Sequence, residues 1–333
     1  MLQFLIRRLL LALITMLVAV SLIFIAIRVL PGNPLLARFG QHVDQAQMEK
    51  IKQEQGWNRP ILQQLGTFLN EVFLHGDLGQ SIARPTENVG QQVLRRLPAT
   101  IELTLAAMII AVPFGISFGV AAAVWRNRFP DYFCMIGSLI GVSVPVFFLG
   151  ICLRAIFTDL PTSQRLPSYV FDFEPLTGLY LIDTLLRGRF ELFLPALKHL
   201  LLPAIALSSI PTAIIARITR SSMLDVLSAD YVRTARAKGN SRWRVVWRHA
   251  FPNASVPIVN IAGFQIGLLL SGAVLTETVF DWPGMGKYIV DAVPDKDYVV
   301  VQAGALVIAT IFVMLNLFLD VVYAWLDPRI RTT

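Results

Sequence analysis

Six long apolar runs constrain this chain more than any other feature of its sequence. About 20 consecutive apolar residues span the hydrocarbon core of a bilayer, and each run approaches or exceeds that length. Soluble proteins carry about 25% charged residues, whereas this chain of 333 residues carries 15% and is 55% hydrophobic. We therefore predict an all-α polytopic membrane protein. Its expected transmembrane helices are residues 9–27, 103–125, 133–153, 199–216, 257–275 and 299–326.

The first apolar run is expected to be a retained transmembrane helix. Arg7 and Arg8 precede it, as basic residues do in a secretory signal peptide. A signal core has about 7–15 apolar residues and ends at a small-residue cleavage site. Here the run is longer, and RVLPGNP follows it. We therefore count this run among the membrane spans.

The distribution of basic residues predicts the orientation. Cytoplasmic loops of membrane proteins carry an excess of Lys and Arg. The segment between the fourth and fifth runs holds eight of them, from Arg217 to Arg248, against Asp225 and Asp230. We therefore expect both termini in the cytoplasm, with segments 31–98 and 158–195 on the outer side of the membrane. The expected parts are a first helix with an extracytoplasmic segment (1–98), a five-helix core (99–327) with a basic loop (221–252), and a cytoplasmic tail (328–333).

Motifs for catalysis are absent from the sequence. It contains no GxxxxGK[ST] phosphate loop, no HExxH and no GxSxG. Cys134 and Cys152 lie in one apolar run and are expected to be packing residues, and the histidines are scattered. We expect no catalytic residue, no metal and no cofactor in this chain. The histidines are His42, His75, His199 and His249.

The basic loop contains the stretch RTARAKGNSRWRVVWRHAFP, which has no acidic residue. We predict a short helix that is capped by Ser228 and stopped by Gly239 in a left-handed conformation. A second helix, capped by Ser241, is expected to end before Pro252. An alternative is a basic hairpin resting on anionic lipid, with Trp243 and Trp247 at the headgroups.

The spacing of residues within this loop resembles that of a known sequence motif. Nine residues separate Gly239 from His249. One further residue separates His249 from Phe251, which Pro252 follows directly. This arrangement is similar to the EAA–glycine loop of bacterial ABC importer permeases, although the Glu, first Ala, Ile and Leu of that pattern differ here. YVRTARAKG resembles the form found in peptide and nickel permeases. RVLPGNP (with Asn33), HGDLGQS, EPLTGLYLIDT, TETVFDWPGMGKYIVDAV, DYVVVQ and LDPRIR resemble further motifs of that family, in order.

The resemblance implies a type-1 ABC importer permease fold in a bacterial inner membrane, most like the B-type dipeptide permease subunit. It implies as partners a second homologous permease, two ABC ATPases that bind ATP and Mg²⁺, an extracytoplasmic substrate-binding protein and membrane lipid, but no nucleic acid. Relatives that carry oligopeptides, glutathione or nickel remain alternatives, as does an ion-coupled secondary transporter. The implied ATPase-coupling residues are Asp230, Tyr231, Arg233, Thr234, Ala235, Arg236, Ala237, Lys238, Gly239, His249 and Pro252.

Two further groups of residues are candidates for transport. A polar set on the third and fifth runs is expected to line the path, although packing or helix capping also explains it. The loop after the fifth run is expected to meet the binding protein or to seal the bundle as a re-entrant cap. The path candidates are Ser143, Pro145, Gln265, Ser271 and Glu277, and the contact candidates are Trp282, Pro283, Gly284, Lys287 and Asp295.

Charged residues at the edges of the apolar runs are expected to snorkel or cap helices rather than to take part in transport. These residues are Glu102, Arg154, Glu277 and Asp320. Small residues of the basic loop are expected to form a face that a partner can approach closely. That face consists of Ala229, Ala235, Ala237 and Gly239.

Overall fold

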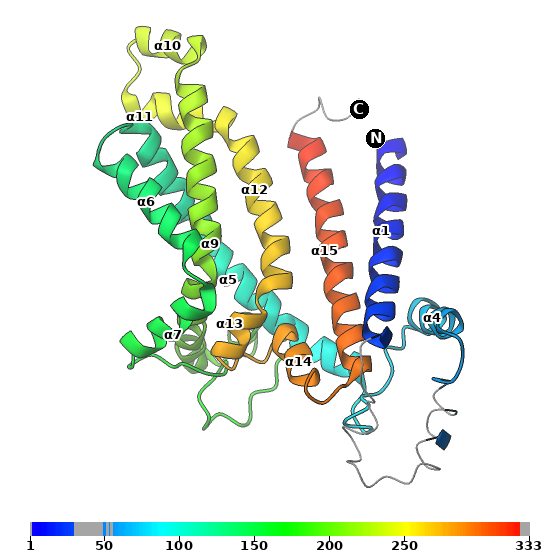
Figure 1. The fold of residues 1–333 in the computed structure, drawn as a ribbon. Helices are drawn as coiled ribbons and strands as arrows, with labels where there is room; N and C mark the ends of the chain where they lie inside the picture. Colours follow the sequence, from blue (N-terminus) through cyan, green and yellow to red (C-terminus); the bar gives the residue numbers. More distant parts are fainter. Residues whose placement is uncertain (1, 30–48, 51–52, 54–55, 327–333) are drawn as a thin grey trace. The chain divides into compact units, whose positions relative to one another are not determined.

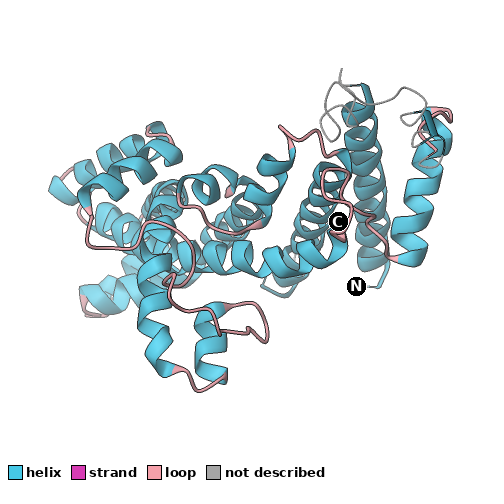
Figure 2. Cartoon of the chain, turned by 90° about the horizontal axis from the view of Figure 1, so that it is seen from below, coloured by secondary structure: helices cyan, strands magenta, loops and turns pink. Residues whose placement is uncertain are grey.

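The computed structural model describes residues 2–29, 49–50, 53 and 56–326, and these residues are helical with connecting loops (Figure 1). Within this described part no strand is formed, apart from one isolated bridge between Gln80 and Asn88 (Figure 2). The all-helical prediction is therefore confirmed. Asn33, His42, Arg329 and the tail 328–333 lie outside the described residues.

Within the described residues, five helices are long and apolar enough to cross a membrane, and a sixth span results if one bent pair is counted as a span. The long helices are α1 (Leu2–Val29), α5 (Val89–Val124), α9 (Phe193–Leu227), α12 (Phe251–Gly272) and α15 (Tyr298–Leu326). The bent pair is α6 (Phe129–Ser143) and α7 (Val146–Ile156). Shorter elements are α4 (Ile61–Asn70), η1 (Glu71–His75), α8 (Tyr180–Leu186), η2 (Phe190–Leu192), α10 (Asp230–Ala237), α11 (Arg242–Arg244), η3 (Val245–Ala250), α13 (Val274–Val279) and α14 (Met285–Ala292).

The third apolar run is not one straight helix, so that part of the prediction is wrong. Helices α6 and α7 meet at an angle of 102°. Pro145 has no N–H to donate and disfavours a helical conformation at the residue before it. Val144 accordingly adopts an extended conformation, with φ −78° and ψ 120°. The bend at Pro145 is sharp enough to redirect the chain.

The fourth run is much longer than the predicted residues 199–216. The span extends over Phe190–Leu227 and contains Pro203 and Pro211 without breaking. Hydroxyl groups help to satisfy carbonyls in this helix: Thr212 Oγ1 donates to the Ser208 carbonyl at 2.7 Å, and Ser208 Oγ to that of Ile205 at 2.9 Å. The helix is longer than a bilayer requires, so it projects beyond the hydrocarbon core.

Two compact units make up the chain. The first comprises Met1–Thr100 and Pro283–Met314. In it, Asp297 accepts hydrogen bonds from Ser81 Oγ at 2.5 Å and from the Ala83 N–H at 3.2 Å. Burial raises the pKa of Tyr288 to about 12. The buried core of this unit contains Val89, Val93, Met285, Tyr288, Ala292, Val300 and Ala303.

The second unit comprises Ile101–Trp282 and Leu315–Thr333, and α9 is its central helix. Helices α6, α7, α8 and α12 all pack against α9. Helix α5 approaches it at a glycine: a Cβ added to Gly119 would lie 2.5 Å from the Ala216 carbonyl oxygen and 2.5 Å from Thr219 Cβ. Small residues permit such close contacts between membrane helices.

This contact predicts that Gly119→Ala destabilises the protein. The added methyl group meets backbone that cannot move aside, and overpacking of this kind costs about 1–3 kcal/mol. The matched control is Gly137→Ala on α6, where an added Cβ meets nothing within 4 Å. Thermal unfolding in detergent, followed by fluorescence, should show a lower melting temperature for Gly119→Ala alone. Equal melting temperatures of the two variants would show that α5 and α9 do not pack as described.

Candidate functional site

The basic loop folds as a compact knob at the end of α9 (Figure 1). After α9 ends at Leu227, Ala229 is extended and α10 follows from Asp230 to Ala237. Gly239 then has φ +76°, so the predicted left-handed stop is confirmed. The chain turns there and enters α11. In the text that follows, the knob is residues 228–250.

One of the two predicted caps is confirmed. Ser241 precedes α11, and its side chain accepts from the Arg244 N–H at 3.4 Å. The other cap is wrong, because Ala229, not Ser228, occupies the N-cap position of α10. Ser228 has right-handed helical angles that complete α9, and its Oγ donates to the Asp225 carbonyl at 2.7 Å. Its hydroxyl therefore serves the preceding helix.

The second helix of the knob does not end before Pro252, so this prediction is also wrong. Helix α11 continues through η3, which is a π-helix, into α12, and one helical span runs from Arg242 to Ser271. Pro252 lies in the first turn of α12. A proline ring clashes with the carbonyl four residues earlier in a regular α-helix. The wider π turns immediately before Pro252 let the helix continue through this position.

The knob has its own small core. Val232, Ala235 and Val245 are buried together, and the Asn240 side chain donates to the Ala235 carbonyl at 2.9 Å. Ala235 is therefore not part of a contact face, in contrast to the prediction. The outward side of α10 is cationic and exposed. Asp230 pairs with Arg233 at 3.5 Å. The exposed residues of α10 and of its C-cap are Asp230, Tyr231, Arg233, Thr234, Arg236, Ala237 and Lys238.

Contacts with neighbouring helices fix the knob in place. Arg242 donates to the Val124 carbonyl at 2.5 Å and lies over the Trp125 ring, 5.7 Å from its centroid. Tyr231 accepts at its hydroxyl from the Asn253 amide of α12 at 2.9 Å. His249 is partly buried, and its carbonyl accepts from the same amide at 3.2 Å. These contacts link the knob to both α5 and α12.

The predicted path residues occupy different environments. Ser143, Pro145 and Ser271 are exposed, whereas Gln265 and Glu277 are buried, with 3% and 0% of their surface exposed. Ser271 Oγ donates to carbonyls of its own helix. The two buried residues face the interior of this chain rather than an open surface. The five residues do not form one lining.

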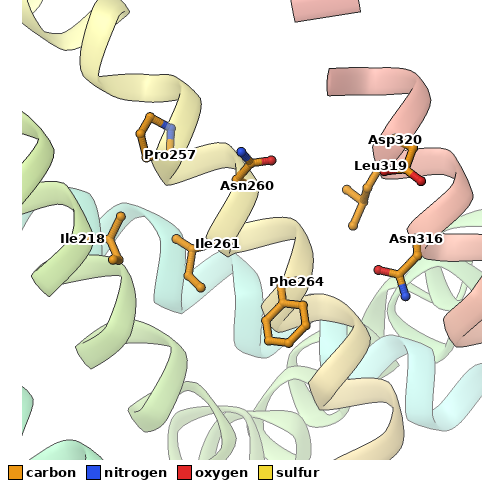
Figure 3. Close-up of a pocket in the computed structure, with 8 residues that line it drawn as sticks. All are labelled: Ile218, Pro257, Asn260, Ile261, Phe264, Asn316, Leu319 and Asp320. Atoms are coloured by element: carbon orange, nitrogen blue, oxygen red, sulfur yellow. The ribbon is translucent and has the colours of Figure 1, made fainter. Parts of the chain in front are cut away.

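A groove with three polar residues in a mostly apolar lining was not predicted from the sequence. Figure 3 shows it between α12 and the carboxyl-terminal half of α15, with Ile218 contributed by α9. Its volume is 480 Å³, and Asn260, Asn316 and Asp320 are its polar residues. Asn260 and Asn316 interrupt apolar runs, which is the signal that could have identified them. Asp320 was assigned to a helix end, but it lines this groove.

A buried ion pair lies elsewhere in the second unit. Arg165 donates to Glu102 at 2.5 Å, and both side chains are at most 8% exposed. Glu102 also accepts a hydrogen bond from the Leu181 N–H at 2.8 Å. Arg165 also donates to the Gly178 carbonyl at 2.7 Å. The Arg165 guanidinium lies 3.6 Å from the Tyr180 ring centroid. This pair fastens the segment between α7 and α9 to α5, so Glu102 is more than a helix cap.

The predicted binding-protein contacts are also divided by burial. Trp282 is only 1% exposed, with Arg165 at 5.6 Å from its ring centroid, so its side chain packs within the chain. Gly284 is buried as well. Pro283 and Asp295 are exposed, and Lys287 pairs with Asp291 at 2.8 Å. Of the five predicted contacts, Pro283 and Asp295 are the exposed ones.

The helical spans, the bent pair and the knob define an inner-membrane transport subunit, and comparison with known families agrees. Residues 115–332 match the family described as "Binding-protein-dependent transport system inner membrane component". Residues 1–104 match the corresponding N-terminal family of such membrane components. The chain belongs to this family of ABC importer permeases. Among the described residues, no group of three or more His, Cys, Asp or Glu could hold a metal ion.

Curated relatives match along the full length. The chain is 42% identical to the dipeptide transport system permease protein of Alkalihalophilus pseudofirmus, over 99% of this chain and 100% of that protein. It is 45% identical to the di/tripeptide transport system permease protein of Pseudomonas aeruginosa, over 99% of each. A glutathione transport system permease protein of Salmonella typhimurium is 38% identical, over 99% of each.

The buried pair predicts a non-additive double-mutant cycle. Arg165→Met should destabilise the protein by about 3–5 kcal/mol, because it leaves the Glu102 carboxylate buried without its partner. Adding Glu102→Gln should restore much of this loss. The control is Arg189→Met, whose pair with Asp172 is exposed and should contribute at most about 1 kcal/mol. Unfolding in mixed micelles is measured for Arg165→Met, Glu102→Gln, their double variant and Arg189→Met, and additive losses at 102 and 165 would contradict the interaction.

Proposed function

We propose that this chain is the transmembrane subunit of an ATP-driven, binding-protein-dependent importer of dipeptides or other short peptides. The observation that carries this proposal is its full-length identity of 42% and 45% to two permease proteins named for dipeptide and di/tripeptide transport. Glutathione is the second candidate substrate, because it is itself a short peptide and the glutathione permease relative is 38% identical. In either case, peptide selection rests largely with the binding protein.

The knob is the proposed contact with the ATPases. Its buried core makes it a rigid projection, and its exposed cations suit an acidic rim on a partner. Arg126, Arg236 and Arg242 also line a cavity of 580 Å³ beside it. In this proposal ATP and Mg²⁺ bind to the two partner ATPases, and this chain needs no cofactor of its own.

A second, homologous permease is proposed to complete the path. The groove of Asn260, Asn316 and Asp320 offers polar side chains, but Gln265 and Glu277 are enclosed by this chain. A hydrated route for a peptide therefore needs polar groups from elsewhere. The competing class is an ion-coupled secondary transporter. Such transporters often have two broken helices, one at the corresponding position in each half of the chain. The described residues contain one such bent pair.

The proposed orientation places the knob and both termini in the cytoplasm. It rests on the cations of the loop between the fourth and fifth runs. Figure 1 shows the knob at one end of α9 and α7 near the other. The segment that follows α7 and the exposed residues of the loop after α13 are then available to an extracytoplasmic binding protein.

Labelling with an impermeant thiol reagent tests this orientation. Single cysteines at Ser163 and Asp295 should react from outside intact cells, whereas one at Asn240 should react only after permeabilisation. Native Cys134 and Cys152 are replaced by alanine in each variant. External labelling at Asn240, with Ser163 protected, would reverse the orientation.

Gly239→Val tests the coupling role of the knob. At φ +76° a side chain is strained, by roughly 1 kcal/mol or more for a β-branched residue. A Cβ there would meet nothing within 4 Å, so the strain is in the backbone alone. We expect Gly239→Val to assemble poorly with the ATPases or to uncouple ATP hydrolysis from peptide uptake in proteoliposomes. Gly239→Asn should be milder, because Asn tolerates this conformation.

The matched control is Gly188→Val, which introduces the same backbone strain at φ +68°, also without a neighbour within 4 Å. It lies between α8 and α9, away from the knob in the sequence, and should leave coupling intact. If Gly239→Val transports normally while neutralising Arg242, Arg244 and Arg248 abolishes transport, the knob is a lipid anchor and not a coupling element.

A further inference from the structure

Helix α4, together with η1, has two opposed faces. Gln64, Thr67 and Glu71 recur at helical spacing and line a polar cavity of 560 Å³ in the first unit. Leu62 lies two positions before Gln64, about 200° around the helix, and is therefore on the other face. Large apolar side chains are exposed on this element. Their exposed fractions are 42% for Ile61, 76% for Leu62, 42% for Phe73 and 76% for Leu74.

The polar face has partners within the chain. Gln64 accepts from Arg28 Nε at 2.7 Å, and its amide donates to the carbonyls of Trp57 and Arg59. Arg28 also donates to Gln302 at 3.0 Å. Hydrogen bonds therefore fix which way α4 is rotated. Both leucines stay largely exposed, with 76% of the surface of each accessible.

The contact with α1 determines the depth of α4 in the membrane. Arg28 follows Arg8 by 20 positions, which is about 30 Å of helix and matches the thickness of a hydrocarbon core. With these two arginines at the two boundaries, Phe24 lies about 6 Å inside the core. Phe68 of α4 packs against Phe24 with ring centroids 5.4 Å apart. The axis of α4 is therefore close to the level where headgroups meet acyl chains.

The direction of α4 fits this level. In Figure 1, α4 is seen nearly end-on beside the carboxyl end of α1, whereas α1 is seen from the side. Helix α4 thus turns across α1 and does not continue as another span. It has 10 residues, too few to cross a bilayer.

We propose that α4 and η1 form an interfacial helix that inserts Leu62 and Leu74 into the bilayer leaflet at the carboxyl end of α1. The occupant of this apolar face is phospholipid. At the depth set by Phe24 and Phe68, a surface that protein does not cover meets acyl chains, and amphipathic helices bind lipid in this way. This inference is independent of the substrate and of the ATPases.

Site-directed spin labelling tests the proposal on the full chain in phospholipid nanodiscs. Labels at Leu62 and at Leu74 are compared with a label at Thr67, the matched control on the polar face of the same helix. Oxygen concentrates in lipid and a nickel chelate stays in water. We expect a several-fold higher ratio of oxygen to nickel accessibility at 62 and 74 than at 67. Ile109, which is 73% exposed in the span of α5, supplies the lipid reference.

Two results would overturn the proposal. If nickel reaches the labels at 62 and 74 as readily as the label at 67, the leucines face water. If these labels are immobile and shielded from both reagents, protein covers the face, whether from a binding protein, a second permease or another part of this chain. Because the labels replace exposed side chains, the fold is not at risk, and thermal unfolding of each labelled variant verifies this.

Discussion

The membrane interior offers no water to peptide groups, and the rest of the structure depends on this constraint. Each described segment that crosses the membrane is a helix, because only a helix satisfies its own N–H and C=O groups. Prolines test the rule in three ways. Pro211 is tolerated within α9, where side-chain hydroxyls bond to nearby carbonyls; Pro252 is preceded by π turns; Pro145 breaks the helix altogether. At the bend between α6 and α7, the helix is therefore interrupted and the chain changes direction.

Buried charges in such an environment are costly unless they are paired, and two buried carboxylates of this chain are paired with arginines distant in sequence. Glu102 and Arg165 fasten the segment before α9 to α5. Asp131, which is 2% exposed, pairs with Arg220 and joins the start of α6 to the later part of α9, with Arg220 Nη2 3.0 Å from its carboxylate. These pairs specify register: sliding one helix along the other by a turn would leave a buried charge without its partner.

The sequence predicts those features that depend on local chemistry, and fails where a partner distant in sequence decides. Apolar length predicted the spans, and Gly239 and Pro145 act through their own backbone. The extent of α9 was underestimated because polar residues do not stop a helix once it leaves the membrane. Ser228 was misassigned because either of two adjacent helices could use its hydroxyl. The groove of Asn260 and Asp320 needs residues about 60 positions apart, which no local pattern can bring together.

One continuous helical span links the knob to the groove. It begins at Arg242 and ends at Ser271, and Asn260 lies 18 positions along it, about 27 Å from its start. The connection between the knob and the groove is thus helical throughout, with no loop in between. Where such an element bends is decided by missing or widened hydrogen bonds, which here lie at η3 and at Pro257. Under the proposed function, the ATPases would act on one end of this helix while Pro257 and Asn260 respond beside the path. The knob therefore needs a fixed shape more than it needs any single charge.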